Sequence, residues 1–211
     1  LAVKKNFFYL GTVINWGRVP EEKFEAILET LNSLTEYRVV WAYNGRPIQT
    51  KPHIYKSSWI PQVDVLYDNR TVLFFSHGGL KSLKETTCSA TPAVFMPMFA
   101  EQVRNGWLAK AKGYAEVFSK HELTTENLRR VMKRVLENKS FADNAARITE
   151  LFHDKVVHPL SQGAHYINRL LRYGGKMPEY FYPRAIGRDY FSHLNLDMLF
   201  IPLVLIVLVS S

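Results

Sequence analysis

Short apolar runs alternate with longer helical patterns along the first half of this chain. The runs read NFFYLGT, YRVVWAY, TVLFFS and AVFMP, and they begin at Asn6, Tyr37, Thr71 and Ala93. Helical spacing of apolar residues is found over residues 19–34, 79–89 and 101–112. Short apolar strands separated by helices are typical of parallel strands that are buried on both faces. The sequence therefore predicts an α/β fold, a Rossmann-like parallel sheet with helices on both faces.

The expected helices have recognisable starts. Pro20 opens the first one, whose apolar face consists of Phe24, Ile27, Leu28, Leu31 and Leu34. In the second half of the chain, Thr124 predicts a capped helix start and Ser140 is expected to open the next helix. A further helix is expected from Leu160 to Tyr173. Helices are thus predicted to follow the sheet.

Composition excludes several classes of function. The chain has 211 residues, a formal charge of +8 and a pI near 9.5, a balance that suits anionic metabolites, membranes or nucleic acid. Its lysines and arginines are scattered and form no basic-aromatic stripe, so no nucleic-acid partner is expected. Cys88 is the only cysteine, which excludes an internal disulfide and any cysteine-based zinc site. No metal site is predicted.

An apolar run, MLFIPLVLIVLV, occupies residues 198–209. It is too short to span a membrane, because a spanning helix needs about 20 apolar residues. Three interpretations fit it: the first part of a transmembrane helix that the chain does not finish, a buried core segment, or an interfacial segment. We favour the first, because an apolar segment after a complete domain has little left to pack against. Residues 174–193 are predicted to be an irregular connector, and residues 194–211 a partial transmembrane segment.

A glycine-rich turn follows the apolar run at residues 71–76. In the stretch SHGGLKSLKE, His77 and two glycines stand directly between a predicted strand and a predicted helix. Such a turn lets backbone N–H groups approach a ligand, and a helix N-terminus favours an anion, so the turn is a candidate phosphate site. Similar turns occur in α/β proteins that bind nothing there. Taken singly, His77 is also explained as a structural histidine, Glu85 as a partner of Lys81, and Trp59 as a packing residue.

Several short motifs keep a fixed register between residues 59 and 102. They are WIPQ at 59–62, HGG at 77–79, Ser82, Glu85, MP at 96–97 and EQ at 101–102. In this combination the segment resembles the donor-binding signature of the UDP-glycosyltransferases, in the membrane-bound animal branch that includes the glucuronosyltransferases. Nearly the whole chain shares the resemblance, but it corresponds only to the C-terminal, donor-binding half of a full-length member. The sequence departs from the family pattern at Tyr9, at Asp68-Asn69, at Thr91 and at Glu101, where Asp is usual.

The resemblance implies that residues 1–173 form the C-terminal domain of a GT-B glycosyltransferase, with a site for a UDP-sugar. Trp59 would stack on the uracil ring, and Glu85 would accept the ribose hydroxyls. The diphosphate would lie at the glycine-rich turn, and the residues after Met96-Pro97 would meet the sugar. The donor-binding residues implied in this way are Gly11, Thr12, Trp59, Ile60, Gln62, His77, Gly79, Leu80, Ser82, Glu85, Glu101 and Gln102.

The resemblance further implies transfer of a hexosyl group from UDP-glucose or UDP-glucuronic acid to the hydroxyl of a small lipophilic acceptor. In the family a histidine on the N-terminal domain, oriented by an aspartate, deprotonates the acceptor. No position here matches that pair, so no catalytic residue is assigned, and no cofactor is expected beside the UDP-sugar co-substrate. The implied location is a single-pass membrane protein of the endoplasmic reticulum with its domain in the lumen. The sequons at Asn69 and Asn138 fit that side.

Two other classes of function stay open. One is a non-catalytic module that binds a UDP-sugar or pairs with a full-length enzyme, as a homo- or hetero-oligomer. The other is an enzyme related to the nucleotide-sugar epimerases, against which the apolar tail and the register of Trp59 argue. The sequence identifies neither the acceptor nor the sugar.

Overall fold

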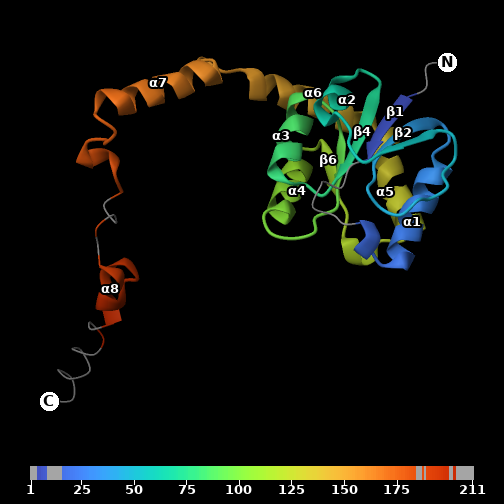
Figure 1. Cartoon of the computed structure of the whole chain (residues 1–211), viewed down its shortest axis with the longest axis horizontal. Helices are drawn as coiled ribbons and strands as arrows, with labels where there is room; N and C mark the ends of the chain where they lie inside the picture. Colours follow the sequence, from blue (N-terminus) through green and yellow to red (C-terminus); the bar gives the residue numbers. More distant parts are fainter. Residues whose placement is uncertain (1–3, 9–15, 184–186, 188, 200–201, 203–211) are drawn as a thin grey trace. The chain divides into compact units, whose positions relative to one another are not determined.

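The fold is known from a computed structural model that describes residues 4–8, 16–183, 187, 189–199 and 202. The chain divides into two compact units, Leu1–Asp154 and Lys155–Ser211 (Figure 1). This division differs from the domain boundary that the sequence placed after residue 173, because helix α7 (Pro159–Arg172) belongs to the second unit. An amphipathic pattern shows that a helix has an apolar face, but not which part of the chain that face contacts. The assignment of donor binding to residues 1–173 stays a prediction.

Six parallel strands form one sheet in the first unit. They are β1 (Lys4–Phe8), β2 (Tyr37–Ala42), β3 (Ile54–Ser57), β4 (Thr71–Ser76), β5 (Ala93–Phe95) and β6 (Ala115–Val117). Across the sheet their order is β3-β2-β1-β4-β5-β6, and each neighbouring pair is parallel. The predicted parallel sheet is thus confirmed. From β1, the strands β2 and β3 follow on one side and β4, β5 and β6 on the other, so the strand order reverses between β1 and β4. In open α/β sheets, ligands bind beyond the carboxyl ends of the strands at such a reversal.

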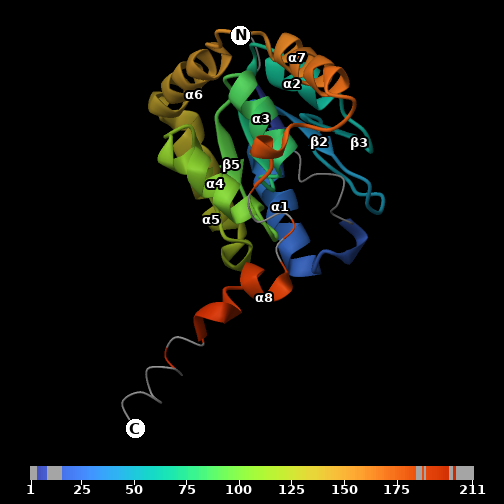
Figure 2. The same ribbon diagram turned by 90° about the vertical axis from the view of Figure 1, so that its left-hand side faces the viewer.

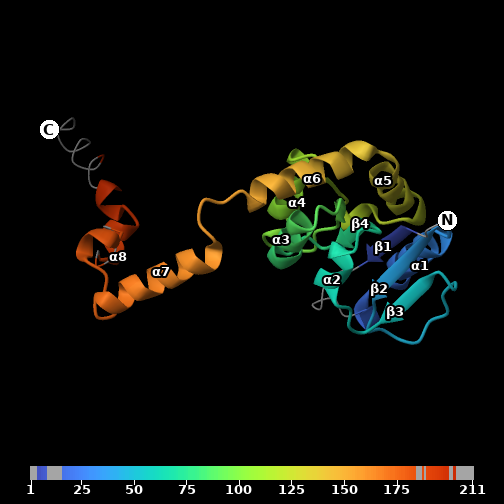
Figure 3. The ribbon, with the colours of Figure 1, turned by 90° about the horizontal axis from the view of Figure 1, so that it is seen from above.

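Helices cover both faces of the sheet, as the sequence predicted. One face carries α1 (Glu21–Ser33) and α5 (Thr125–Glu137), which contact each other. The other face carries α2 (Gln62–Tyr67), α3 (Leu80–Cys88), α4 (Gln102–Ala111) and α6 (Lys139–His153). Figure 3 shows the two helical layers with the strands between them. Within the second layer α3 contacts α2, α4 and α6, and Figure 2 shows α3 beside α4.

Two apolar cores lie between the sheet and its helical layers. In β4, Leu73 and Phe75 point to the core beneath α1 and α5, whereas Phe74 points to the core beneath the other four helices. All three side chains are fully buried. This alternation follows from the two-residue period of a strand, and it explains why the run at 71–76 is apolar on both faces. The predicted apolar face of α1 is confirmed, since Phe24, Ile27, Leu31 and Leu34 are buried in the first core and Leu28 packs against it.

The helix starts agree with the sequence at one position and differ at another. Thr124 caps α5 as predicted, because its hydroxyl accepts a hydrogen bond from Asn127 N at 3.2 Å. Helix α6 begins before the predicted Ser140: Asn138 is its cap, and Asn138 Oδ1 accepts from Ser140 N at 3.0 Å. Both Asn and Ser are good cap residues, so the pattern alone did not select between them.

The sequence did not predict strand β3, which lies at the edge of the sheet. It has four residues, and Ile54 is its one buried residue. It is held by parallel pairing with β2, in which Ile54 lies opposite Val39. A strand this short carries too little periodicity for a sequence-based prediction, and its stability comes from hydrogen bonds to a distant part of the chain.

The regular secondary structure that is described in the second unit is helical. Helix α7 matches the predicted helix to within one residue at each end, and α8 (Tyr190–His193) lies within the predicted connector. Of the helices in the described residues, none has both the length and the apolar composition needed to cross a membrane. Most of the predicted partial transmembrane segment, including residues 203–211, lies outside the described residues.

Candidate functional site

The turn that follows β4 carries the glycine pair singled out in the sequence. Strand β4 ends at Ser76 and helix α3 begins at Leu80, so three residues, His77, Gly78 and Gly79, make the connection. Gly78 has a φ of +82°, a left-handed conformation that favours glycine. The first N–H groups of α3 have no acceptor within the helix, and they carry the positive end of its dipole. The turn therefore presents hydrogen-bond donors to an anion at the strand-order reversal.

His77 lies against the start of α3. A Cβ atom placed on Gly79 would be 2.6 Å from His77 Nε2, which is closer than real Cβ contacts. The absence of a side chain at Gly79 thus makes room for the imidazole ring. The structure therefore places His77 and Gly79, two of the predicted diphosphate residues, beside each other.

A polar cluster joins α2 to α3. The side-chain amide of Gln62 donates from Nε2 to the carboxylate of Glu85 and to Ser82 Oγ at 3.4 Å. Ser82 is buried, while Gln62 and Glu85 are half-buried. Gln62 Oε1 is itself buried and has no hydrogen-bond partner among the described residues. The cluster therefore combines a carboxylate, a hydroxyl and an unsatisfied amide oxygen, groups that suit the hydroxyls and amides of a nucleoside.

Trp59 and Ile60 precede this cluster and differ sharply in exposure. The side chain of Trp59 is 72% exposed, which is unusual for so large an aromatic group. This exposure argues against the interpretation of Trp59 as a packing residue of the core. Ile60, in contrast, is buried in the core beneath α2, so mainly its backbone is available to a ligand.

The two residues assigned to the sugar occupy different environments at the start of α4. Glu101 is exposed, directly before the first residue of the helix. Gln102 is 4% exposed, and its Oε1 accepts hydrogen bonds from Met98 N at 2.9 Å and from Phe99 N at 3.3 Å. Gln102 thus shapes the loop between β5 and α4, and its NH₂ group is the part left for a ligand.

Asn105 contacts the glycine-rich turn, although no role was predicted for it. Its side chain is 6% exposed, and Nδ2 donates to the carbonyl oxygen of Gly78 at 3.0 Å. The residue shares the buried face of α4 with Gln102, Gly106 and Ala109. A polar residue on an otherwise buried helical face signals a specific hydrogen bond, since burying an unpaired amide is unfavourable. That signal was present in the spacing of these four residues.

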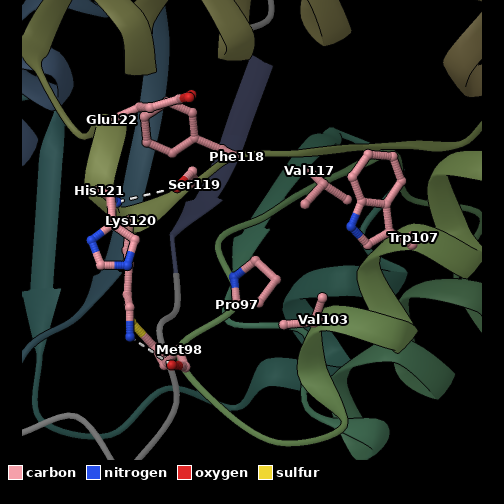
Figure 4. Close-up of a pocket in the computed structure, with 10 residues that line it drawn as sticks. All are labelled: Pro97, Met98, Val103, Trp107, Val117, Phe118, Ser119, Lys120, His121 and Glu122. Carbon is pink, nitrogen blue, oxygen red and sulfur yellow. Dashed lines mark hydrogen bonds between the residues drawn. The ribbon is translucent and has the colours of Figure 1, made fainter.

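A pocket of about 430 Å³ lies beside the loop between β5 and α4 (Figure 4). It is lined by Pro97 and Met98, by Val103 and Trp107 of α4, and by residues 117–122. Lys120 Nζ donates to the carbonyl oxygen of Met98 at 2.7 Å across its mouth. None of the predicted donor residues lines this pocket, so it is separate from the polar cluster.

The structure thus brings five of the predicted donor residues into two groups near the start of α3. His77 and Gly79 form the turn, and Gln62, Ser82 and Glu85 form the polar cluster. Gly11 and Thr12 lie outside the described residues. In the part of the chain that the structure describes, no three His, Cys, Asp or Glu side chains lie close enough together to hold a metal ion.

Comparison of the sequence with known proteins gives one family. Residues 6–210 match the profile of the family described as "UDP-glucoronosyl and UDP-glucosyl transferase". The chain is 31% identical over 169 residues to the UDP-glucuronosyltransferase of Pleuronectes platessa, covering 80% of this chain and 35% of that relative. It is 28% identical over 204 residues to UDP-glucuronosyltransferase 1A9 of Homo sapiens, covering 96% of this chain and 38% of that relative. The chain thus spans little more than a third of the length of these curated relatives.

Comparison of the structure with solved structures gives the same kind of fold. The calicheamicin glycosyltransferase CalG4 superimposes with a TM-score of 0.67 at 19% identity, covering 81% of this chain and 44% of that chain. Spinosyn forosaminyltransferase superimposes with a TM-score of 0.63 at 19% identity, covering 72% of this chain and 40% of that chain. These identities carry an inference about fold alone. The shared architecture is the parallel α/β type of the GT-B glycosyltransferases, as the sequence predicted.

Proposed function

Because the chain belongs to the UDP-glucoronosyl and UDP-glucosyl transferase family, as its motifs predicted, we propose that it binds a UDP-sugar at the carboxyl edge of its sheet. As part of a longer enzyme, it would present that donor for transfer of the hexosyl group to the hydroxyl of a small lipophilic acceptor. The observation that carries the proposal is the polar cluster of Gln62, Ser82 and Glu85 beside the glycine-rich turn. A nucleoside and a diphosphate need these two kinds of group next to each other.

Each part of the donor has a proposed partner. The exposed ring of Trp59 stacks on uracil, and the amide of Gln62 meets the nucleoside. The carboxylate of Glu85 accepts hydrogen bonds from the ribose hydroxyls. In this proposal Ile60 contributes its backbone, because its side chain is buried in the core.

The diphosphate is proposed to lie at the start of α3. His77, Ser82 and the N–H groups of Gly79 and Leu80 surround it there, and Gly11 and Thr12, which lie outside the described residues, are proposed as further partners. UDP is the leaving group of the transfer, and negative charge builds on its diphosphate as the glycosidic bond breaks. Donors that are already oriented toward this charge lower the barrier, because they need little reorganisation.

The sugar is proposed to meet Glu101 and the NH₂ group of Gln102. Glu101 carries one methylene more than the usual Asp, so its carboxylate reaches further toward the hydroxyls. The choice between glucose and glucuronic acid would depend on this position. We further propose that the base for the acceptor hydroxyl lies outside this chain, so that residues 1–211 bind the donor without transferring the sugar.

The test has two steps. UDP is titrated into the full chain by calorimetry, and measurable affinity is expected. The chain is then incubated with UDP-glucose or UDP-glucuronic acid and a panel of phenols, alone and with a separately expressed N-terminal domain of a relative. Transfer is expected only in the mixture, because a positioned base contributes about 10² to 10⁴-fold. A chain without affinity for UDP would overturn the proposal. Binding of UDP without transfer, either alone or in the mixture, would favour a non-catalytic module. Interconversion of UDP-sugars without an acceptor would favour an epimerase-like enzyme.

A membrane location is proposed on the basis of residues 194–211, as part of a single-pass anchor, with residues 1–173 in the lumen of the endoplasmic reticulum. Asn69 and Asn138 are exposed, so lumenal placement predicts a mass shift on endoglycosidase treatment of protein made in cells. Ser140→Ala removes one sequon and keeps the Asn138 cap, and Asn69→Gln removes the other. An unshifted mass together with digestion of the domain in sealed microsomes would contradict this placement.

A further inference from the structure

Asn105 is buried behind the glycine-rich turn, where it contacts backbone. It lies on α4, and its Nδ2 donates to the carbonyl oxygen of Gly78 at 3.0 Å. The backbone of α4 also approaches the turn: a Cβ atom placed on Gly78 would be 3.3 Å from the carbonyl oxygen of Gln102. The N-terminal part of α4 therefore packs directly on the turn. The side-chain amide of Asn105 links α4 to the turn through a hydrogen bond.

This hydrogen bond fixes the direction of a second group. The carbonyl of Gly78 and the N–H of Gly79 belong to one peptide unit, which is planar and trans, so they point in opposite directions. Holding the Gly78 carbonyl toward α4 therefore turns the Gly79 N–H away from α4. Glycine at position 78, with a φ of +82°, has an unusually wide choice of backbone conformations, so this peptide needs an external restraint.

We propose that Asn105 is a positioning residue for donor binding: by holding the Gly78 carbonyl, it aims the Gly79 N–H at the diphosphate. This inference rests on the proposed function, in which the Gly79 N–H is one of the diphosphate donors. Asn105 does not touch the ligand itself, since its side chain is buried against the turn. Its contribution is confined to the diphosphate, because Gln62 and Glu85, the residues proposed for the nucleoside, lie on α2 and α3 and share no hydrogen bond with Asn105 among the described residues.

The chain offers a matched control. Asn144 of α6 donates from Nδ2 to the carbonyl oxygen of Gly113 at 3.1 Å, and Gly113 has a φ of +79°. The chemistry is therefore the same: an asparagine amide that holds the carbonyl of a left-handed glycine. Gly113 precedes β6, so it lies at the amino ends of the parallel strands, whereas the glycine-rich turn follows β4 at their carboxyl ends. A purely structural effect of losing such a bond should appear equally in both variants.

The experiment compares UDP with uridine, which lacks the diphosphate. Both are titrated into the full chain by NMR, for the unsubstituted protein and for Asn105→Ala, Asn105→Leu and Asn144→Ala. The two Asn105 variants are expected to lose about tenfold in affinity for UDP and to keep the affinity for uridine. Asn144→Ala is expected to keep both affinities. Asn105→Leu keeps the branched shape of the asparagine side chain and carries no charge, but it cannot donate to the carbonyl, so it tests the bond if Asn105→Ala does not fold.

The outcomes separate this inference from the proposed function. Equal losses for UDP and uridine, or unchanged UDP affinity in a folded Asn105 variant, would overturn the positioning role while leaving UDP binding intact. A loss in Asn144→Ala as large as that in Asn105→Ala would also overturn it. Failure of the unsubstituted chain to bind UDP would overturn the proposed function and this inference with it.

Discussion

The side-chain amide of Gln62 donates a hydrogen bond to the carboxylate of Glu85, which joins the first turn of α2 to the middle of α3. Two residues that are 23 positions apart in the sequence therefore share one polar cluster. A carboxylate has two oxygens and about four acceptor positions, so a single donor does not saturate it. The orientation imposed by Gln62 leaves Glu85 able to accept hydrogen bonds from two adjacent hydroxyls.

The first prediction concerns the ribose. Glu85→Gln should weaken UDP binding by about tenfold, because a neutral amide accepts hydroxyl hydrogen bonds less strongly than a carboxylate. The unsubstituted chain should prefer UDP to 2′-deoxy-UDP, and Glu85→Gln should reduce that preference. Calorimetry with both nucleotides measures the effect, with the exposed neighbour Lys84→Gln as control. An unchanged preference in Glu85→Gln would show that this carboxylate does not meet the 2′-hydroxyl.

The second prediction concerns Trp59. Trp59→Ala should cost about 1 to 3 kcal/mol of UDP affinity, the range seen when a base loses an aromatic stacking partner. Because the ring is 72% exposed, the same substitution should change the unfolding temperature little. Trp107→Ala is the matched control, since Trp107 is also an exposed tryptophan, 55% accessible, on another element. Equal UDP affinities of Trp59→Ala and the unsubstituted chain would exclude the stack.

The third prediction concerns the choice of sugar. Glu101→Asp should change the ranking of UDP-glucose and UDP-glucuronic acid and leave the affinity for UDP nearly unchanged, because UDP has no group at the sugar position. Competition binding of the three ligands provides the measurement. Glu122→Asp, at another exposed glutamate, is the control. Parallel changes for UDP and both UDP-sugars would remove Glu101 from the sugar site.

The fourth prediction concerns the space beside His77. Gly79 has φ −60° and ψ 150°, which alanine adopts without strain, but the new Cβ would lie 2.6 Å from His77 Nε2. The imidazole must therefore move, and Gly79→Ala should weaken UDP binding by about five- to tenfold with little loss of stability. Gly163→Ala in α7 is the control, because a Cβ there has no neighbour within 4 Å among the described residues. Undiminished UDP binding by Gly79→Ala would show that the ring position is unimportant.

The fifth prediction concerns stability and pH. Burial raises the pKa of Glu116, but Lys110 at 2.9 Å and Arg134 at 3.3 Å outweigh it, and the net pKa lies below its ordinary value. A carboxyl whose pKa is lower in the folded state stabilises the fold above its unfolded pKa, and this stabilisation is lost as the pH falls through the folded value. Glu116→Gln should therefore lower the free energy of unfolding by about 1 kcal/mol at neutral pH, since both partners are partly exposed.

The difference between Glu116→Gln and the unsubstituted chain should shrink as the pH falls below about 4, because protonated glutamic acid then resembles glutamine. Urea unfolding at several pH values measures it. Glu150→Gln, at an exposed position of α6, should show no such trend. A pH-independent difference for Glu116→Gln would contradict the ion-pair explanation.

Local patterns in the sequence were sufficient for several elements of the sheet and its helices, and they supplied the candidate site as a prediction. The continuous apolar run of β4, the apolar face of α1 and the Thr124 cap are properties of single elements, and such properties are visible as local composition and spacing. The register of Trp59, His77, Ser82 and Glu85 could likewise be read directly, because a shared motif needs no coordinates. The same reasoning failed for β3, whose four residues are held by pairing with β2.

The tertiary structure decided which of these residues touch. That Gln62 bonds Glu85 depends on how α2 packs beside α3, and that Asn105 holds Gly78 depends on how α4 packs on the glycine-rich turn. The sequence assigned Gln102 and left Asn105 without a role, because a buried polar side chain has meaning only through its partner, and that partner lies on another element. Composition and spacing determine which side chains each helix or strand carries. The packing of these elements on a common sheet determines which of those side chains come into contact.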